Sequence, residues 1–140
     1  MFNVYIFLIV LTILQISLDL NSTATKKCMC DHFNPKLLTI FLSHHIFNIF
    51  ANFGWLVPNK QILFIYVIMI PILFMHWQTN DDKCILTQLY NKECGFNDSY
   101  VFNDFFSMVG LKKYDLWYDY GYRLYLIMGF CIALYKLYFM

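Results

Sequence analysis

Long apolar runs separated by polar connections dominate the chain. Four runs are long enough to consider as membrane spans: residues 2–18, 37–57, 62–77 and 120–138. A helix needs about 20 mostly apolar residues to cross a bilayer. The apolar residues are continuous within each run and do not alternate, which favours helices over the strands of a membrane barrel. The pattern predicts an all-α integral membrane bundle of four transmembrane helices, forming a single membrane domain over residues 1–140.

The polar connections between these spans are unequal in length. Four spans place residues 19–36 and 78–119 on one side of the membrane, and both termini with the turn 58–60 on the other. In residues 99–114 the apolar side chains recur at helical spacing. We expect an additional short interfacial helix there, lying on the membrane surface or capping the bundle. A second short helix is expected over residues 84–90, and Pro71 is expected to kink the third span.

Composition supports a membrane environment and excludes one class of partner. The chain has 140 residues, of which 60% are hydrophobic, 21% aromatic and 14% charged. So short a chain has too little interior to hide that much apolar surface from water. A net charge of +1 leaves no electrostatic footprint for nucleic acid. The expected partners are therefore a lipid bilayer and other membrane proteins, without nucleic acid.

Basic residues and cysteines give opposite indications of orientation. The side that carries the long connections holds most of the basic residues: Lys26, Lys27, Lys36, Lys83, Lys92, Lys112, Lys113 and Arg123. Only Lys60 and Lys136 lie on the other side, so the positive-inside rule favours connections that face the cytoplasm. Two glycosylation sequons, at residues 21–23 and 97–99, and the paired cysteines instead favour an oxidising compartment. We favour the cytoplasmic orientation.

Four cysteines lie in the connections, Cys28 and Cys30 in the first and Cys84 and Cys94 in the third. They could form two disulfides that tie the connections together, with the pairing left open. The arrangement also resembles the layout of quinone-linked disulfide oxidases and the vitamin K epoxide reductase family, but no Cys-x-x-Cys is present. A metal site formed by Cys28, Cys30, His32 and Cys84 is a further alternative, although its spacing matches no established zinc pattern. Free thiols without a role also remain open.

Polar residues recur inside the second apolar run, where lipid makes them costly. They are Ser43, His44, His45, Asn48 and Asn52. Helical spacing aligns His44, Asn48 and Asn52 on one face, which must turn toward other helices or a cavity. We favour hydrogen bonding between helices, with Thr12, Gln15 and Tyr66 as expected partners. A proton path or an ion site is the alternative, and no cofactor is expected.

The end of the third run carries a recognisable pattern of residues. The segment HWQTNDDKCILT includes His76, Trp77, Asn80, Cys84, Leu86 and Thr87. His76 and Trp77 suit the boundary between lipid and water. The Asn-Asp-Asp turn is expected to cap the following short helix, whose first turn would favour a Cys84 thiolate.

This segment resembles small multi-span membrane proteins of nucleocytoplasmic large DNA viruses and, more distantly, a family of small bacterial membrane proteins. The resemblance covers about a third of the chain. It implies a virion membrane and capsid or membrane partners, and it implies a viral thiol oxidase able to form disulfides in the cytoplasm.

No complete catalytic set occurs in the chain: nucleophile elbow, phosphate-binding glycine loop and His-Glu-x-x-His are all absent. We therefore expect a non-enzymatic structural or assembly component of a membrane. A membrane thiol-disulfide oxidoreductase is the first alternative, and a small transporter or channel subunit is the second.

Overall fold

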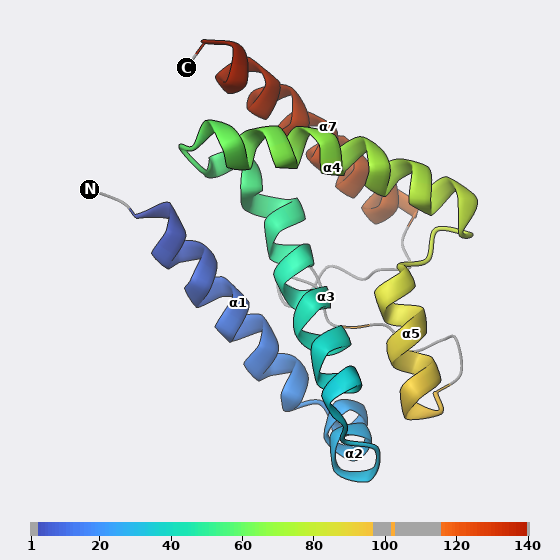
Figure 1. Cartoon of the computed structure of the whole chain (residues 1–140). Coiled ribbons are helices and arrows are strands. Elements are labelled where there is room, and N and C mark those ends of the chain that lie inside the picture. Colours follow the sequence, from blue (N-terminus) through green and yellow to red (C-terminus); the bar gives the residue numbers. More distant parts are fainter. Residues whose placement is uncertain (1–2, 97–101, 103–115, 140) are drawn as a thin grey trace.

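The computed structural model describes residues 3–96, 102 and 116–139, with side chains from residue 120 onward in the last segment (Figure 1). Helices dominate that part of the chain, and it contains no strand, so the all-α fold class is confirmed for the described residues. The elements in chain order are α1 (Val4–Leu20), α2 (Thr23–Asp31), α3 (Pro35–Phe53), the 3-10 turn η1 (Gly54–Leu56), α4 (Lys60–Thr79), α5 (Ile85–Cys94) and α7 (Leu116–Phe139).

Asparagine side chains begin three of the long helices. Asn3, Asn34 and Asn59 precede α1, α3 and α4, and each accepts a hydrogen bond from a backbone N–H of the first turn. These bonds satisfy donors that a helix start leaves without an intrahelical partner. Pro35 occupies the first turn of α3, where its missing N–H has no cost. The caps start α3 and α4 two residues before the predicted starts of their spans, 37 and 62.

Two helices differ from expectation in the connections, and one expected helix cannot be compared. The first connection contains α2, which the apolar pattern did not predict, because its threonines and lysines form no apolar face. The third contains α5, which continues to Cys94 rather than ending at residue 90. Pro71 lies inside α4, which is helical on both sides of it. The helix expected over residues 99–114 lies outside the described residues apart from Phe102.

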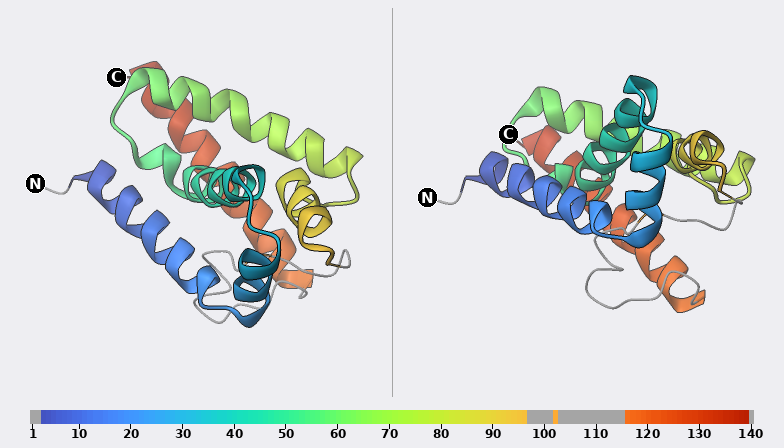
Figure 2. Two further views of the ribbon diagram at one scale, coloured as in Figure 1. Left: turned by 60° about the horizontal axis from the view of Figure 1, so that its bottom comes forward. Right: turned by 90° about the horizontal axis from the view of Figure 1, so that it is seen from below.

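The helices are arranged with α3 at the centre and at a steep angle to the others. The left panel of Figure 2 shows α3 nearly end-on, while α1, α4 and α7 are seen from the side. Both termini and the turn between α3 and α4 lie at one end of the molecule, and α2 and α5 lie toward the other (Figure 1). Within its most apolar 18-residue window α3 is 50% buried, against 22% for α4 and 17% for α7. It is therefore the helix that the others enclose.

Two hydrophobic cores share α3. The first packs α2, α5 and the N-terminal half of α3 together, and we call these three segments the cap. Its buried residues are Cys28, Leu37, Ile40, Phe41, Tyr90, Cys94 and Phe102. The second core joins the C-terminal end of α3 to α4 and α7, and its buried residues are Ala51, Leu63, Tyr66, Ile70, Leu73, Leu126 and Ala133. We call α1, the remainder of α3, α4 and α7 the helical body.

The outer faces of the helical body are apolar and exposed. The exposed residues of α1 and α4 include Ile6, Ile9, Val10, Ile13, Leu14, Phe64, Ile65, Ile68, Ile72 and Met75. Three helices, Pro35–Leu56, Lys60–Thr79 and Tyr120–Phe139, are long and apolar enough to cross a membrane. The pair α1 and α2, bent by 81° between its members, passes the same test, which raises the number of candidate spans to four. The fold is compatible with an integral membrane protein.

Two glycines of α7 provide a matched test of packing in the helical body. A Cβ at Gly129 would lie 2.7 Å from the Trp55 ring and 2.8 Å from the Tyr66 hydroxyl, whereas one at Gly121 would meet nothing within 4 Å. Gly121→Ala should stabilise the protein by up to about 1 kcal/mol, because alanine favours helices. Gly129→Ala should instead destabilise it by about 1–3 kcal/mol, because rigid rings must move. Thermal unfolding in detergent would measure both, and equal stabilisation by the two changes would contradict the packing of α7.

Candidate functional site

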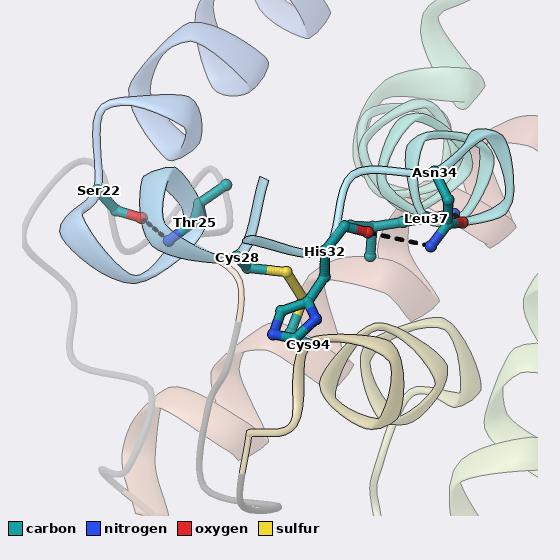
Figure 3. Close-up of a disulfide and its surroundings, with 7 residues drawn as sticks. All are labelled: Ser22, Thr25, Cys28, His32, Asn34, Leu37 and Cys94. Carbon is teal, nitrogen blue, oxygen red and sulfur yellow. Dashed lines mark hydrogen bonds between the residues drawn. A yellow bond between two sulfur atoms is a disulfide. The ribbon is translucent and has the colours of Figure 1, made fainter. Parts of the chain in front are cut away.

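A disulfide closes the cap. Cys28 of α2 is bonded to Cys94 at the end of α5, with a Cα–Cα distance of 5.3 Å across 66 positions of sequence (Figure 3). Both cysteines are buried. The Ser22 hydroxyl starts α2 by accepting the Thr25 N–H at 3.2 Å. Gly95 ends α5 with a φ of 65°, a left-handed conformation that suits glycine. The Ser22 cap and the Gly95 terminus thus set where α2 begins and where α5 ends, and each of these helices carries one of the bonded cysteines.

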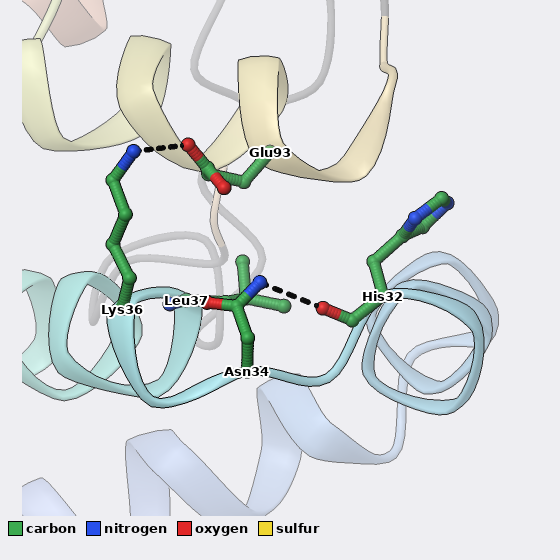
Figure 4. Close-up of polar contacts among 5 residues, drawn as sticks. All are labelled: His32, Asn34, Lys36, Leu37 and Glu93. Atoms are coloured by element: carbon green, nitrogen blue, oxygen red, sulfur yellow. Dashed lines mark hydrogen bonds and ion pairs between the residues drawn. The ribbon is translucent and has the colours of Figure 1, made fainter.

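An ion pair joins α3 to α5, in addition to the disulfide between α2 and α5. Lys36 Nζ lies 2.5 Å from Glu93 Oε1 (Figure 4), and Glu93 directly precedes the bonded Cys94. Between α2 and α3, Asn34 donates to the His32 carbonyl at 3.0 Å while its own oxygen caps α3. The lysine is largely exposed, so the pair contributes at most about 1 kcal/mol. The disulfide, whose effect grows with the length of the closed loop, is the stronger constraint at about 4 kcal/mol.

The disulfide resolves part of the alternatives for the cysteines. One bond forms, where two were one of the alternatives: Cys30 is exposed and Cys84 is half-buried, both as free thiols. The bonded sulfur of Cys28 also removes a thiolate from the metal set of Cys28, Cys30, His32 and Cys84. Among the described residues, no group of three or more His, Cys, Asp or Glu side chains is placed to hold a metal ion.

The polar stripe of α3 is bonded to neighbouring helices. Gln15 of α1 donates to Asn48 Oδ1 at 3.2 Å, as expected for interhelical bonding. Asn52 donates back to the Asn48 carbonyl at 2.8 Å. The Tyr125 hydroxyl of α7, which sequence reasoning missed, donates to the Asn52 carbonyl at 2.6 Å. The stripe thus joins α1, α3 and α7.

Further donors satisfy the backbone at the C-terminal end of α3. The last carbonyls of a helix have no intrahelical partner and need donors from elsewhere. The Tyr66 hydroxyl donates to the Ala51 carbonyl at 3.1 Å, and Trp55 Nε1 donates to the Asn52 carbonyl at 2.9 Å. Lys136 Nζ reaches the Trp55 carbonyl at 3.0 Å. Tyr66 does bond between helices, but to the Ala51 backbone and not to a residue of the stripe. Thr12 bonds within its own helix, to the Leu8 carbonyl.

His45 faces an acidic partner that the sequence assigned to a connection. Asp19 Oδ2 lies 3.3 Å from His45 Nε2, and both side chains are fully buried. Asp19 belongs to the last turn of α1, which continues to Leu20 instead of ending at residue 18. The missed signal was available: Thr12, Gln15 and Asp19 recur at helical spacing on one face of α1.

His44, the other histidine, faces the cap. Its Nδ1 lies 3.9 Å from Cys84 Sγ, which joins two candidate residues 40 positions apart. The His44 ring stacks on Phe102 with centroids 4.2 Å apart, which fixes the orientation of the imidazole. Ser43, the remaining member of the stripe, is half-buried.

The corner between α4 and α5 is built differently from the expected cap. His76 Nε2, not the Asn-Asp-Asp turn, accepts the first N–H of α5, that of Ile85, at 3.2 Å. Asn80 ends α4 and donates to the Lys83 carbonyl at 2.7 Å and to Gln88 Oε1 at 3.0 Å. The predicted cap was wrong because the side-chain amide of Asn80 acts as a donor within the turn, while the His76 imidazole accepts the first N–H of α5. Leu86 and Thr87 are half-buried in the first turn of α5.

Charged residues complete this corner on its outer side. Asp81 and Asp82 have φ of 49° and 58°, so the turn passes through two left-handed residues. Asp82 pairs with Arg123 of α7 at 2.6 Å, and the Arg123 guanidinium lies 6.0 Å from the Trp77 ring centre. The start of α7 is thereby held against the end of α4.

The comparisons with known proteins add no relative: no protein-family model, curated protein or solved structure matches this chain significantly. The arrangement itself offers a buried disulfide, an interhelical polar network and a Cys84–His44 contact.

The Asp19–His45 pair yields a test by double replacement. Asp19→Leu or His45→Leu alone should cost about 3–5 kcal/mol, because each leaves the other polar group buried. The double change should cost less than the two single changes together by at least about 1 kcal/mol. Denaturant unfolding in detergent measures the three variants, with the exposed Asp31→Leu as a control expected within about 0.5 kcal/mol. Additive losses would show that the two side chains do not depend on each other.

Proposed function

We propose that this chain is a multi-pass integral membrane protein that acts as a non-enzymatic structural or assembly component of its membrane. The observation that carries the proposal is the division between a helical body with apolar outer faces and a cross-linked cap at one end. Contiguous apolar faces of this extent are unfavourable in water. In lipid they need no further partner, and the helices satisfy their own backbone groups.

A structural role for the disulfide is better supported than a redox role. Cys28 is 1% exposed and Cys94 6%, whereas an exchanging disulfide needs an accessible sulfur. Cys28 and Cys30 are two residues apart on the helix α2, so their side chains point in roughly opposite directions. Cys84 lies at the opposite end of α5 from Cys94. A resolving thiol is therefore not adjacent to the bonded pair.

A transport role has less support than interhelical bonding. The Gln15 amide donates to Asn48 Oδ1, and the Asn52 amide donates to the Asn48 backbone carbonyl. The Tyr125 hydroxyl donates to the Asn52 carbonyl. Such bonds hold small membrane bundles together. An ion or proton path would instead require polar groups that are open to water along the helix.

The membrane that fits best is a viral one with the cap facing the cytoplasm. Lysines at the cap end favour the cytoplasmic side, yet this end carries a disulfide. A thiol oxidase in the cytoplasm would allow a disulfide on that side. Residues 76–87 resemble membrane proteins of viruses that encode such an oxidase. Other membrane or capsid proteins are then the expected partners of the cap.

Membrane extraction combined with thiol trapping tests this role. In isolated membranes the protein should resist extraction by alkaline carbonate. Cys30 should react with a water-soluble maleimide without reductant, while Cys28 and Cys94 stay protected. Cys28→Ser should leave Cys94 as a free thiol and lower the free energy of unfolding by about 2–5 kcal/mol. Cys30→Ser should change neither the Cys28–Cys94 bond nor the stability.

Two results would contradict the proposal. Release of the protein by carbonate would exclude membrane integration. Reduction of the Cys28–Cys94 bond by a substrate thiol and its reoxidation by a quinone, over repeated turnovers, would establish an oxidoreductase instead.

A further inference from the structure

Cys84 occupies an unusual position for a free thiol. It is the N-cap residue of α5, directly after the turn that ends α4, and it is half-buried without belonging to the disulfide. Its sulfur lies 3.9 Å from Nδ1 of His44, which belongs to another helix. His44 is only 7% exposed and is stacked on Phe102, so its ring is held in place beside the sulfur.

A cysteine within reach of a fixed imidazole is the arrangement of an activated nucleophile. The imidazole can accept the thiol proton as the sulfur attacks an electrophile. The two ligands are too few for a metal site, since the described residues offer no third donor. Cys28 and Cys94 are bonded to each other, so neither can provide a disulfide partner for Cys84.

The surroundings of Cys84 specify an apolar electrophile. Exposed apolar side chains follow it on α5: Ile85, the next residue, is 48% exposed and Leu89 is 37% exposed. Ile85 and Leu89 lie one helical turn apart and share a face. In the proposed membrane placement these residues lie where the lipid ends, and juxtamembrane cysteines of this kind accept fatty acyl chains.

We propose that Cys84 is an S-acylation site that takes a long fatty acyl chain from an acyl thioester such as acyl-coenzyme A. The inference rests on the proposed membrane function. The Cys84 sulfur attacks the thioester carbonyl carbon while its proton passes to His44 Nδ1. The bond from that carbon to the donor sulfur breaks, and the donor thiolate takes the proton from His44 to leave as a free thiol. One thioester is exchanged for another, and no oxidant or reductant is needed.

Cys84 is the modified residue in this account, and His44 is the base that takes the proton from its sulfur. The acyl chain would lie over Ile85 and Leu89, anchoring the corner between α4 and α5 to the lipid surface. Each buried CH₂ of such a chain adds to membrane attachment.

Site mapping in membranes tests the proposal directly. The protein is expressed in eukaryotic cells fed an alkyne-bearing palmitate, and the modified cysteine is mapped by mass spectrometry after release with neutral hydroxylamine. We expect the label on Cys84, its loss in Cys84→Ser, and its retention in Cys30→Ser and Cys131→Ser. Carbonate extraction of the same membranes reports integration independently. An integrated protein with unmodified Cys84, or with the label only on Cys30 or Cys131, overturns the inference and leaves the membrane function standing.

A second measurement separates the role of His44 from a folding effect. Purified protein in detergent is mixed with palmitoyl-coenzyme A, and the rate of Cys84 acylation is followed against pH. His44→Gln should lower the rate about 100-fold near neutral pH and recover toward wild type in alkali, where the thiol ionises without a base. An intact Cys28–Cys94 disulfide in the variant would exclude misfolding. A pH profile identical to wild type would overturn the role of His44.

Discussion

The requirement that governs this molecule is the satisfaction of polar groups on α3, a helix enclosed by others. Its stripe of histidines and asparagines is largely buried, and a buried polar group is costly without a hydrogen-bond partner. From α1, Asp19 pairs with His45 and Gln15 bonds to Asn48. The Tyr125 hydroxyl of α7 bonds to the Asn52 carbonyl, and Cys84 contacts His44. These contacts tie α3 to α1, to α7 and to the start of α5.

The two halves of the molecule use different physical means to the same end. The helical body relies on close packing at Gly129 and on hydrogen bonds to backbone carbonyls, because its outer faces add nothing to a core. The cap is small and partly polar, and it is held by a covalent bond between Cys28 and Cys94 with an ion pair beside it. Residues of α3 belong to both cores, so this helix joins the cap to the body.

Sequence reasoning predicted the apolar helices well, because long continuous apolar runs indicate helices and do not fit the alternating pattern of strands. It also identified His44, Asn48 and Asn52 as an inward face, since helical spacing is a local property. It missed Asp19, whose assignment depended on where α1 ends. It also misassigned the cap of α5, which His76, nine residues before Ile85, supplies. The pairing of Cys28 with Cys94 depends on how α2 and α5 are placed in space. Spacing along the chain left that pairing open.

The central claim is that the helical body and α3 lie in lipid, while α2 and α5 of the cap lie in water. Nitroxide labels in reconstituted bilayers measure this directly, by their relaxation with oxygen, which concentrates in lipid, and with a water-soluble nickel chelate. Labels at Ile9, Ile68 and Ile127, all exposed on the body, should respond to oxygen and resist the chelate, while a label at Cys30 should respond to the chelate. Strong chelate access at all three isoleucine positions would contradict the account.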